Sequence, residues 1–278
     1  MAYQSIEVRK LTPVIGAEIF GVDLAKPLGN QQFQEVHDAL MENLVIFFRD
    51  QTMTVDQHKA FGRRFGKLHV HPNAPQELAG HPEILVIKAD ENSKHVAGED
   101  WHSDVSCDEE PPMGSILHMH TVPPDGGGDT MFANMYAAYD ALSQPLKTML
   151  EGMTALHDSA KVHRYRTKAS DRGDMAFPRT AQPVVRTHPV TGRKALYVNR
   201  GFTTRIIQLR PHESEAMLEM LYRHCETPEF MCRFQWKPNS VAFWDNRSTQ
   251  HHALFDYHPH RRYGLRVTVQ GDKPFYRA

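Results

Sequence analysis

The sequence has few cysteines, no long apolar run and no excess of one charge. Three cysteines among 278 residues, irregularly spaced, exclude a disulfide framework and a cysteine-based zinc site, so we expect reduced thiols and a cytoplasmic protein. Thirty-two basic residues face 33 acidic ones, so no binding surface for nucleic acid or membrane lipid is predicted. No stretch approaches the roughly 18 apolar residues of a membrane-spanning helix. The first ten residues lack the apolar core of a signal peptide.

Repeats, low-complexity tracts and Pro- or Ser-rich linkers are also absent, so we expect one domain spanning residues 1–278. Runs rich in β-branched and aromatic residues predict strands at Val45–Phe48, Ile84–Ile87, Ser115–His120, Leu196–Asn199, Met231–Trp236, Val241–Trp244 and Leu265–Gln270. Helical spacing or capping predicts helices at Asn30–Glu42, from Thr54 to before Gly66, and at Glu213–Cys225. These elements do not alternate as βαβ units, which favours a mainly β sandwich or jelly roll with flanking helices.

The segment Asp158–Gln182 differs from its surroundings. It is charged, rich in Arg and Lys, and shows little apolar periodicity. Long loops in compact domains often close over a site. We therefore expect a lid loop at about residues 158–182.

The first residues with a chemical role are His102 and Asp104. In an extended segment, residues two apart point the same way, so this imidazole and carboxylate can converge on one ion. His251 or its neighbour His252 offers a third ligand. Two histidines and one carboxylate form the facial triad of non-heme iron(II) oxygenases. The same three ligands could also hold zinc with a bound water in a hydrolase.

Two arginines follow the candidate histidines. Arg262 and Arg266 are four residues apart, so on a strand both guanidinium groups face the same side. Buried guanidinium groups need anionic partners, which are either internal carboxylates or small acidic ligands. The run Gly126-Gly127-Gly128 lacks the Lys-Ser/Thr of a phosphate loop and predicts a tight turn that presents the Thr130 hydroxyl.

These segments together resemble the family of iron(II)- and 2-oxoglutarate-dependent dioxygenases that includes taurine dioxygenase and the aryloxyalkanoate dioxygenases. The resemblance extends over nearly the whole chain. The segments that carry it are Gly16-Ala17-Glu18, Gly21-Val22-Asp23-Leu24, Arg63-Arg64-Phe65-Gly66, Trp101-His102-Ser103-Asp104, Gly127-Gly128-Asp129-Thr130, Gly201-Phe202-Thr203-Thr204-Arg205, Trp244-Asp245-Asn246-Arg247 and Gly271-Asp272-Lys273-Pro274-Phe275-Tyr276.

The resemblance implies a double-stranded β-helix (jelly-roll) core and an enzyme that uses Fe(2+), 2-oxoglutarate and O2. It implies that His102, Asp104 and His251 bind the iron. It also implies that Thr130 and Arg262 hold a carboxylate of 2-oxoglutarate. Arg266 would bind the substrate anion, and His71 and Phe202 would line the same pocket. The expected product from a sulfonate such as taurine is an aldehyde and sulfite.

The sequence also departs from taurine enzymes of this family. Gly98 stands where those enzymes have an asparagine that contacts the substrate. His163 stands at the position where they have a phenylalanine of the pocket. Both changes predict a wider pocket, so another sulfonate, an aryloxyalkanoate or another carboxylate is an alternative substrate. A zinc hydrolase and a non-catalytic jelly-roll binding protein are the remaining alternatives. The family resemblance favours a homo-oligomer, a dimer or a tetramer.

Overall fold

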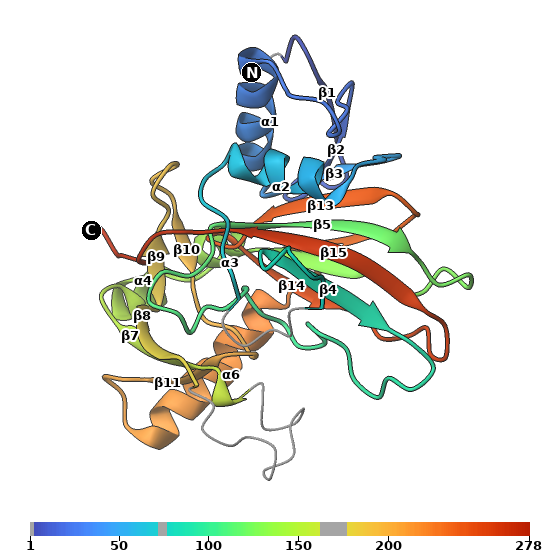
Figure 1. The fold of residues 1–278 in the computed structure, drawn as a ribbon. Helices are drawn as coiled ribbons and strands as arrows, with labels where there is room; N and C mark the ends of the chain where they lie inside the picture. The colour runs from blue at the N-terminus through green and yellow to red at the C-terminus, as the bar shows by residue number, and fades with distance from the viewer. Residues whose placement is uncertain (1–2, 72–76, 162–176) are drawn as a thin grey trace.

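Strands dominate the fold, and helices lie at its outer faces (Figure 1). The computed structural model describes residues 3–71, 77–161 and 177–278. The chain is therefore mainly β with flanking helices, as the sequence predicts. None of the helices in the described part is long and apolar enough to cross a membrane.

A seven-stranded sheet forms the centre of the fold (Figure 1). Neighbouring strands in it are antiparallel, except that β2 and β3 are parallel. Its strands, from one edge to the other, are β1 (Glu7–Lys10), β2 (Ala17–Phe20), β3 (Val45–Phe48), β13 (Ser240–Asp245), β5 (Gly114–Thr121), β15 (Arg262–Val269) and β4 (Ile84–Ala89).

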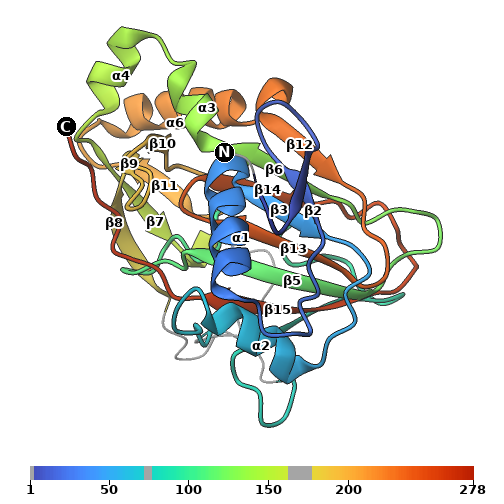
Figure 2. The same cartoon turned by 90° about the horizontal axis from the view of Figure 1, so that it is seen from above.

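Helices α1 (Asn30–Asn43) and α2 (Val55–Arg63) cover the outer face of this sheet (Figure 2). Alternate residues of β3 separate the two faces. Ile46 and Phe48 pack with the helices, and Phe47 belongs to the core on the opposite face. The predicted capping box of α2 is confirmed, because the Thr54 and Gln57 side chains each bond the other's backbone N–H.

A three-stranded sheet faces the inner side of the large sheet. Its strands are β12 (Met231–Phe234), β6 (Thr130–Asn134) and β14 (Thr249–Ala253), in that order. Phe234 of β12 stacks on Phe47 of β3, with ring centroids 3.8 Å apart, and Phe132 of β6 lies 5.6 Å from Trp244 of β13. These aromatic contacts hold the two sheets face to face.

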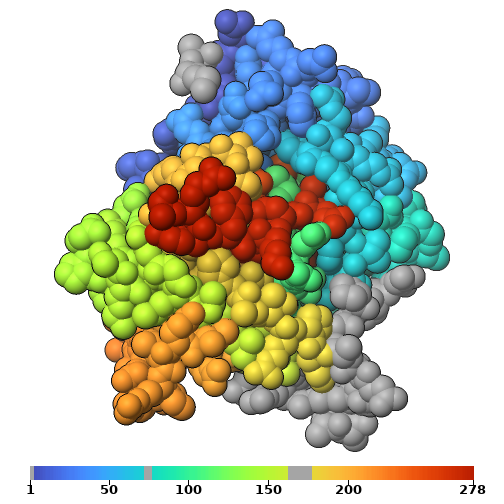
Figure 3. Space-filling model, turned by 90° about the vertical axis from the view of Figure 1, so that its left-hand side faces the viewer, coloured from blue at the N-terminus to red at the C-terminus, as the bar shows by residue number. Residues whose placement is uncertain are grey.

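The remaining elements extend the inner side. Two smaller sheets hold β11 (Thr203–Ile206), β7 (Thr154–Asp158) and β8 (Arg179–Pro183), and β10 (Lys194–Leu196) with β9 (Val185–Thr187). The helices there are α3 (Met135–Asp140), α4 (Gln144–Leu150), α6 (Pro211–Cys225) and the 3-10 helix η2 (Pro228–Phe230). The C-terminal segment lies on the surface (Figure 3). There the backbone carbonyl of Phe275 accepts a hydrogen bond from the backbone N–H of Thr187 in β9.

Two predicted segments need correction. The predicted strand Leu196–Asn199 ends at Leu196, because the Asn199 side chain accepts the Phe202 N–H at 2.8 Å and bends the chain. The predicted loop 158–182 is too long at its C-terminal end, since residues 179–182 pair with β7 as part of β8. Most of that loop, including His163, lies outside the described residues.

Candidate active site

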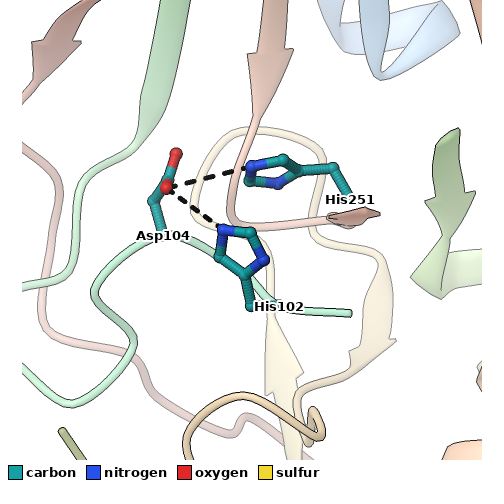
Figure 4. A group of neighbouring side chains, drawn as sticks. All are labelled: His102, Asp104 and His251. Carbon is teal, nitrogen blue, oxygen red and sulfur yellow. Dashed lines mark ion pairs between the residues drawn. The ribbon is translucent and has the colours of Figure 1, made fainter. Parts of the chain in front are cut away.

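Strand β14 and the loop before β5 bring three predicted ligands together. His102 and His251 form an isolated antiparallel bridge with backbone hydrogen bonds of 3.1 and 2.8 Å in its two directions. Asp104 lies two residues further along the same extended loop. Its Oδ1 is 3.6 Å from His102 Nε2 and 3.9 Å from His251 Nε2 (Figure 4). Segments about 150 residues apart in sequence thus supply one site.

His251, and not its neighbour His252, faces Asp104. Successive residues of a strand point to opposite sides. The His252 ring accordingly stacks on Trp101, with centroids 5.5 Å apart. The sequence pattern left this choice open, and the register of β14 decides it.

The three side chains suit a divalent metal. One ligand atom from each lies within 4.8 Å of the others, and no other such group of three occurs in the described part of the chain. The His102 Nδ1–H donates to the Asp100 carbonyl at 2.7 Å, which leaves the Nε2 lone pair toward Asp104. Burial holds the pKa of His251 well below its usual value, so this imidazole is neutral and able to bind a metal. Two imidazoles and one carboxylate are the donor set of non-heme iron(II).

Asp104 is buried and ionised. Burial alone would raise its pKa, but the charge of Arg266 holds it well below the usual value. Arg266 Nη1 donates to Asp104 Oδ1 at 2.8 Å. The sequence predicts either an internal carboxylate or a small acidic ligand as the partner of each arginine. For Arg266, an internal carboxylate is present. The Arg266 Nε is buried and has no hydrogen-bond partner among the described residues.

Arg262 is the other arginine of β15, and its surroundings differ. Arg262 is only 5% exposed, and its Nε and Nη2 have no partner within residues 3–71, 77–161 and 177–278. Trp236 lies 5.7 Å from the guanidinium carbon. Desolvation lowers the pKa of Arg262 but leaves it a cation at neutral pH. A buried cation with free N–H groups requires an anionic ligand.

Thr130 and the glycine run complete this end of the site. The Thr130 oxygen accepts the Trp236 Nε1–H at 3.0 Å, so its own proton remains available for a ligand. Gly128 has φ +81°, and a Cβ there would lie 3.0 Å from Arg262 Cδ. The glycines therefore serve close approach to the arginine stem, not phosphate binding.

One cavity of about 230 Å³ joins both ends of the site. Nine of the ten residues that the sequence nominated line it, and the tenth, His163, lies outside the described residues. They are His71, Gly98, His102, Asp104, Thr130, Phe202, His251, Arg262 and Arg266. Burial, followed by the charge of Arg266, lowers the pKa of His71 to about 4, so this histidine is neutral at pH 7.

Sequence reasoning missed the walls of the cavity. Leu85, Ile87 and Leu117 are apolar residues of β4 and β5 that carry no local signal of their own. Leu85 lies opposite Arg266 in the register of β4 and β15. Ser159 also lines the cavity, and its buried hydroxyl has no partner among the described residues. The pairing of β4 and β5 with β15 brings the three apolar positions together.

Gly98 lines the cavity, but its surroundings differ from the expectation that it widens the pocket. Its φ is +84°, and a Cβ at this position would lie 3.0 Å from His102 Cε1. The space that a side chain would take is therefore used by the His102 ring. The missing side chain allows this close approach and does not simply widen the pocket.

Comparisons with known proteins agree with this geometry. The sequence profile described as "Taurine catabolism dioxygenase TauD, TfdA family" matches residues 7–268. An alpha-ketoglutarate-dependent sulfonate dioxygenase of Saccharomyces cerevisiae is 34% identical, over 97% of this chain and 68% of the relative. An alpha-ketoglutarate-dependent sulfate ester dioxygenase of Pseudomonas putida is 34% identical, over 97% of this chain and 91% of the relative.

A solved structure agrees as well. The crystal structure of a taurine dioxygenase from Burkholderia xenovorans superposes with a TM-score of 0.84 and 38% identity, over 98% of this chain and 92% of that one. The profile match covers most of the chain, and the relatives align over nearly all of it. The chain therefore belongs to the TauD/TfdA family of dioxygenases.

Proposed function

We propose that this protein is an iron(II)- and 2-oxoglutarate-dependent dioxygenase that hydroxylates a small organic anion, with a sulfonate or a sulfate ester as the preferred class. The observation that carries the proposal is the shared cavity. It joins a His-Asp-His ligand set to two arginines that lie at different ends. A zinc hydrolase would not explain the buried N–H groups of Arg262, which have no partner among the described residues. The named activities of the yeast and Pseudomonas relatives favour the same class.

Each residue then has one task. His102, Asp104 and His251 would hold Fe(2+), and Arg262 with Thr130 would bind the distal carboxylate of 2-oxoglutarate. When bound, iron and 2-oxoglutarate supply oxidation of a substrate C–H bond by O2, with succinate and CO2 as coproducts. The chain contributes binding, orientation and exclusion of water.

Arg266 and His71 would bind the substrate anion, with Phe202 covering its other side. The Arg266 Nε, which has no partner among the described residues, supplies a donor, and the neutral His71 lines the same cavity. A carbon that bears a sulfonate and becomes hydroxylated loses sulfite and leaves an aldehyde. The apolar walls Leu85 and Ile87 also fit an aromatic group, so an aryloxyalkanoate is the second candidate substrate.

Four further features complete the proposal. The two facing sheets form a jelly-roll core, supported by the 0.84 TM-score to a taurine dioxygenase structure. Residues 1–278 make one domain, and the predicted lid at about residues 158–182, with His163, falls largely outside the described residues. The protein works as a homo-oligomer, a dimer or a tetramer. Its three buried, free cysteines fit a reducing cytoplasm.

The test is coupled turnover. Purified protein with Fe(2+), 2-oxoglutarate and O2 is assayed for succinate in the presence of taurine, longer alkanesulfonates, alkyl sulfates and aryloxyacetates. We expect succinate formation to depend on iron and to be stimulated by sulfonates or sulfate esters, with matching release of sulfite or of sulfate. Stimulation by aryloxyacetates alone would overturn the substrate class, and zinc-dependent hydrolysis without succinate would overturn the enzyme class.

A further inference from the structure

A closed ring of hydrogen bonds surrounds Asp104 on the side away from the two histidines. Ser115 Oγ donates to Asp104 Oδ2 at 2.7 Å. Asn246 Nδ2 donates to that same Ser115 oxygen at 3.2 Å, and Asn246 Oδ1 accepts the Asp104 backbone N–H at 3.3 Å. The ring therefore grips both the backbone and the carboxylate of one residue.

The donors and acceptors of this ring can be arranged in only one way. The Trp244 Nε1–H also donates to Asn246 Oδ1, at 3.0 Å, which fixes the orientation of the amide. Asn246 must then use its NH2 group toward Ser115, and Ser115 must give its own proton to Asp104. The bond to the carboxylate is charge-assisted and lies out of water, because Ser115 and Asn246 are both at most 1% exposed.

Resting on the proposed function, we infer that Ser115 and Asn246 are positioning residues that present Asp104 to the metal through Oδ1 alone. Oδ1 faces His102 and His251 and also accepts the bond from Arg266, whereas Oδ2 is occupied by Ser115. Without the hydroxyl, Oδ2 would be a buried carboxylate oxygen lacking its donor, and only the Arg266 bond to Oδ1 would hold the carboxylate. Loss of such a supporting partner lowers metal affinity by about 10- to 100-fold.

The inference is tested on the apoprotein by calorimetric titration with Co(2+), which needs no turnover. We expect Ser115→Ala to raise the Co(2+) Kd by about 10- to 100-fold and to alter the visible absorption of the bound cobalt. Ser115→Thr, which keeps the hydroxyl, should recover most of the affinity. The matched control is Ser240→Ala, which removes the hydroxyl of another fully buried serine that contacts Arg49 and not Asp104.

Asn246→Ala supplies a second, independent variant. If both residues act through the same carboxylate, the Ser115→Ala/Asn246→Ala double variant should bind Co(2+) little worse than Ser115→Ala alone. A merely structural role would lower the Tm of Ser115→Ala and Ser240→Ala alike and leave both Kd values and spectra unchanged. That result would overturn the inference.

The two proposals fail in different ways. If the unmodified protein and His102→Ala bind Co(2+) equally, the metal site itself, and with it the proposed function, is wrong. If His102→Ala abolishes binding but Ser115→Ala binds as the unmodified protein does, only the role of Ser115 is wrong.

Discussion

Arg262 and Arg266 lie on one strand and face one cavity, but they meet different partners. Arg266 already bonds Asp104, whereas Nε and Nη2 of Arg262, which lines the same cavity as Thr130, have no partner in the described part of the chain. We expect Arg262→Ala to raise the Kd for 2-oxoglutarate at least about 30-fold, since truncating one partner of a buried charge pair costs about 2 kcal/mol or more. Arg266→Ala should instead raise the Kd for the sulfonate. Calorimetric titration of each variant with each ligand measures both effects.

The matched control is the neighbouring arginine. Arg261 is exposed and pairs with Glu91 on the surface at 3.4 Å, so Arg261→Ala should bind both ligands normally. Equal losses of both affinities in Arg262→Ala and Arg266→Ala would contradict the division of tasks between them.

The ligand residues give a second prediction at this scale. Alanine at His102, Asp104 or His251 should each reduce 2-oxoglutarate-dependent succinate formation to background, because each removes one of three protein ligands. His252→Ala should stay active, since His252 stacks on Trp101 outside the cavity. Activity that survives in His251→Ala but not in His252→Ala would show that His252, and not His251, is the metal ligand.

At the scale of elements, buried strands were easier to predict than short paired ones. β3 and β13 are buried on both faces and appear in the sequence as continuous apolar runs. β6 and β14 were not predicted, because their pattern is interrupted by the polar residues that the site needs, such as Thr130 and His251. Their pairing depends on partners more than 100 residues away, which no local pattern encodes.

The same limit applied to the site. The spacing of His102 and Asp104, and of Arg262 and Arg266, predicted residues that share a side, and the structure places each pair in the cavity. Leu85 is different, because it enters the site only through its pairing with Arg266. Family resemblance added His71 and Phe202, which spacing alone would not have found.

Helix α2 offers a prediction that separates stability from function. Thr54 caps this helix at the outer face of the large sheet, away from the cavity. Thr54→Ala should cost about 1 kcal/mol of unfolding free energy, a Tm decrease of roughly 2–4 °C for a chain of this size. Thr52 is an exposed threonine before the cap, so Thr52→Ala should change neither the free energy of unfolding nor the Tm. Differential scanning calorimetry measures the Tm, and loss of Co(2+) affinity in Thr54→Ala would contradict a purely structural role.

At the scale of the whole molecule, buried histidines make stability depend on pH. Burial lowers the folded-state pKa of His58 to about 3, of His118 to about 4 and of His157 to about 3, against an ordinary value of 6.5. Between these values the unfolded chain binds more protons, so this stability is complete above pH 6.5 and declines as the pH falls toward 3. The Tm measured from pH 7.5 to pH 4.5 should therefore decrease.

A single variant tests the source of that decrease. His58 contacts the Ile116 carbonyl at 3.1 Å and lies beside His118. Glutamine can keep the bond to the carbonyl without titrating, so His58→Gln should lose less Tm on acidification than the unmodified protein does. An identical pH dependence would show that other groups control the acid response.

The shape and lining of the cavity lead to a prediction about substrate choice. Arg266 would bind the sulfonate. Leu85, its register partner on the neighbouring strand β4, forms an apolar wall together with Ile87 and Leu117. Each buried methylene contributes about 0.8 kcal/mol, or roughly a fourfold gain in affinity. The kcat/KM should therefore rise from ethanesulfonate to butanesulfonate and exceed that of taurine, whose ammonium group must lose its water. Leu85→Phe should narrow the cavity beside this wall and remove the increase in kcat/KM for the longer alkanesulfonates. The Kd for 2-oxoglutarate should not change. Sulfite release across the series measures this, and an exclusive preference for taurine would mean that Asp100, at the cavity edge, binds the ammonium group.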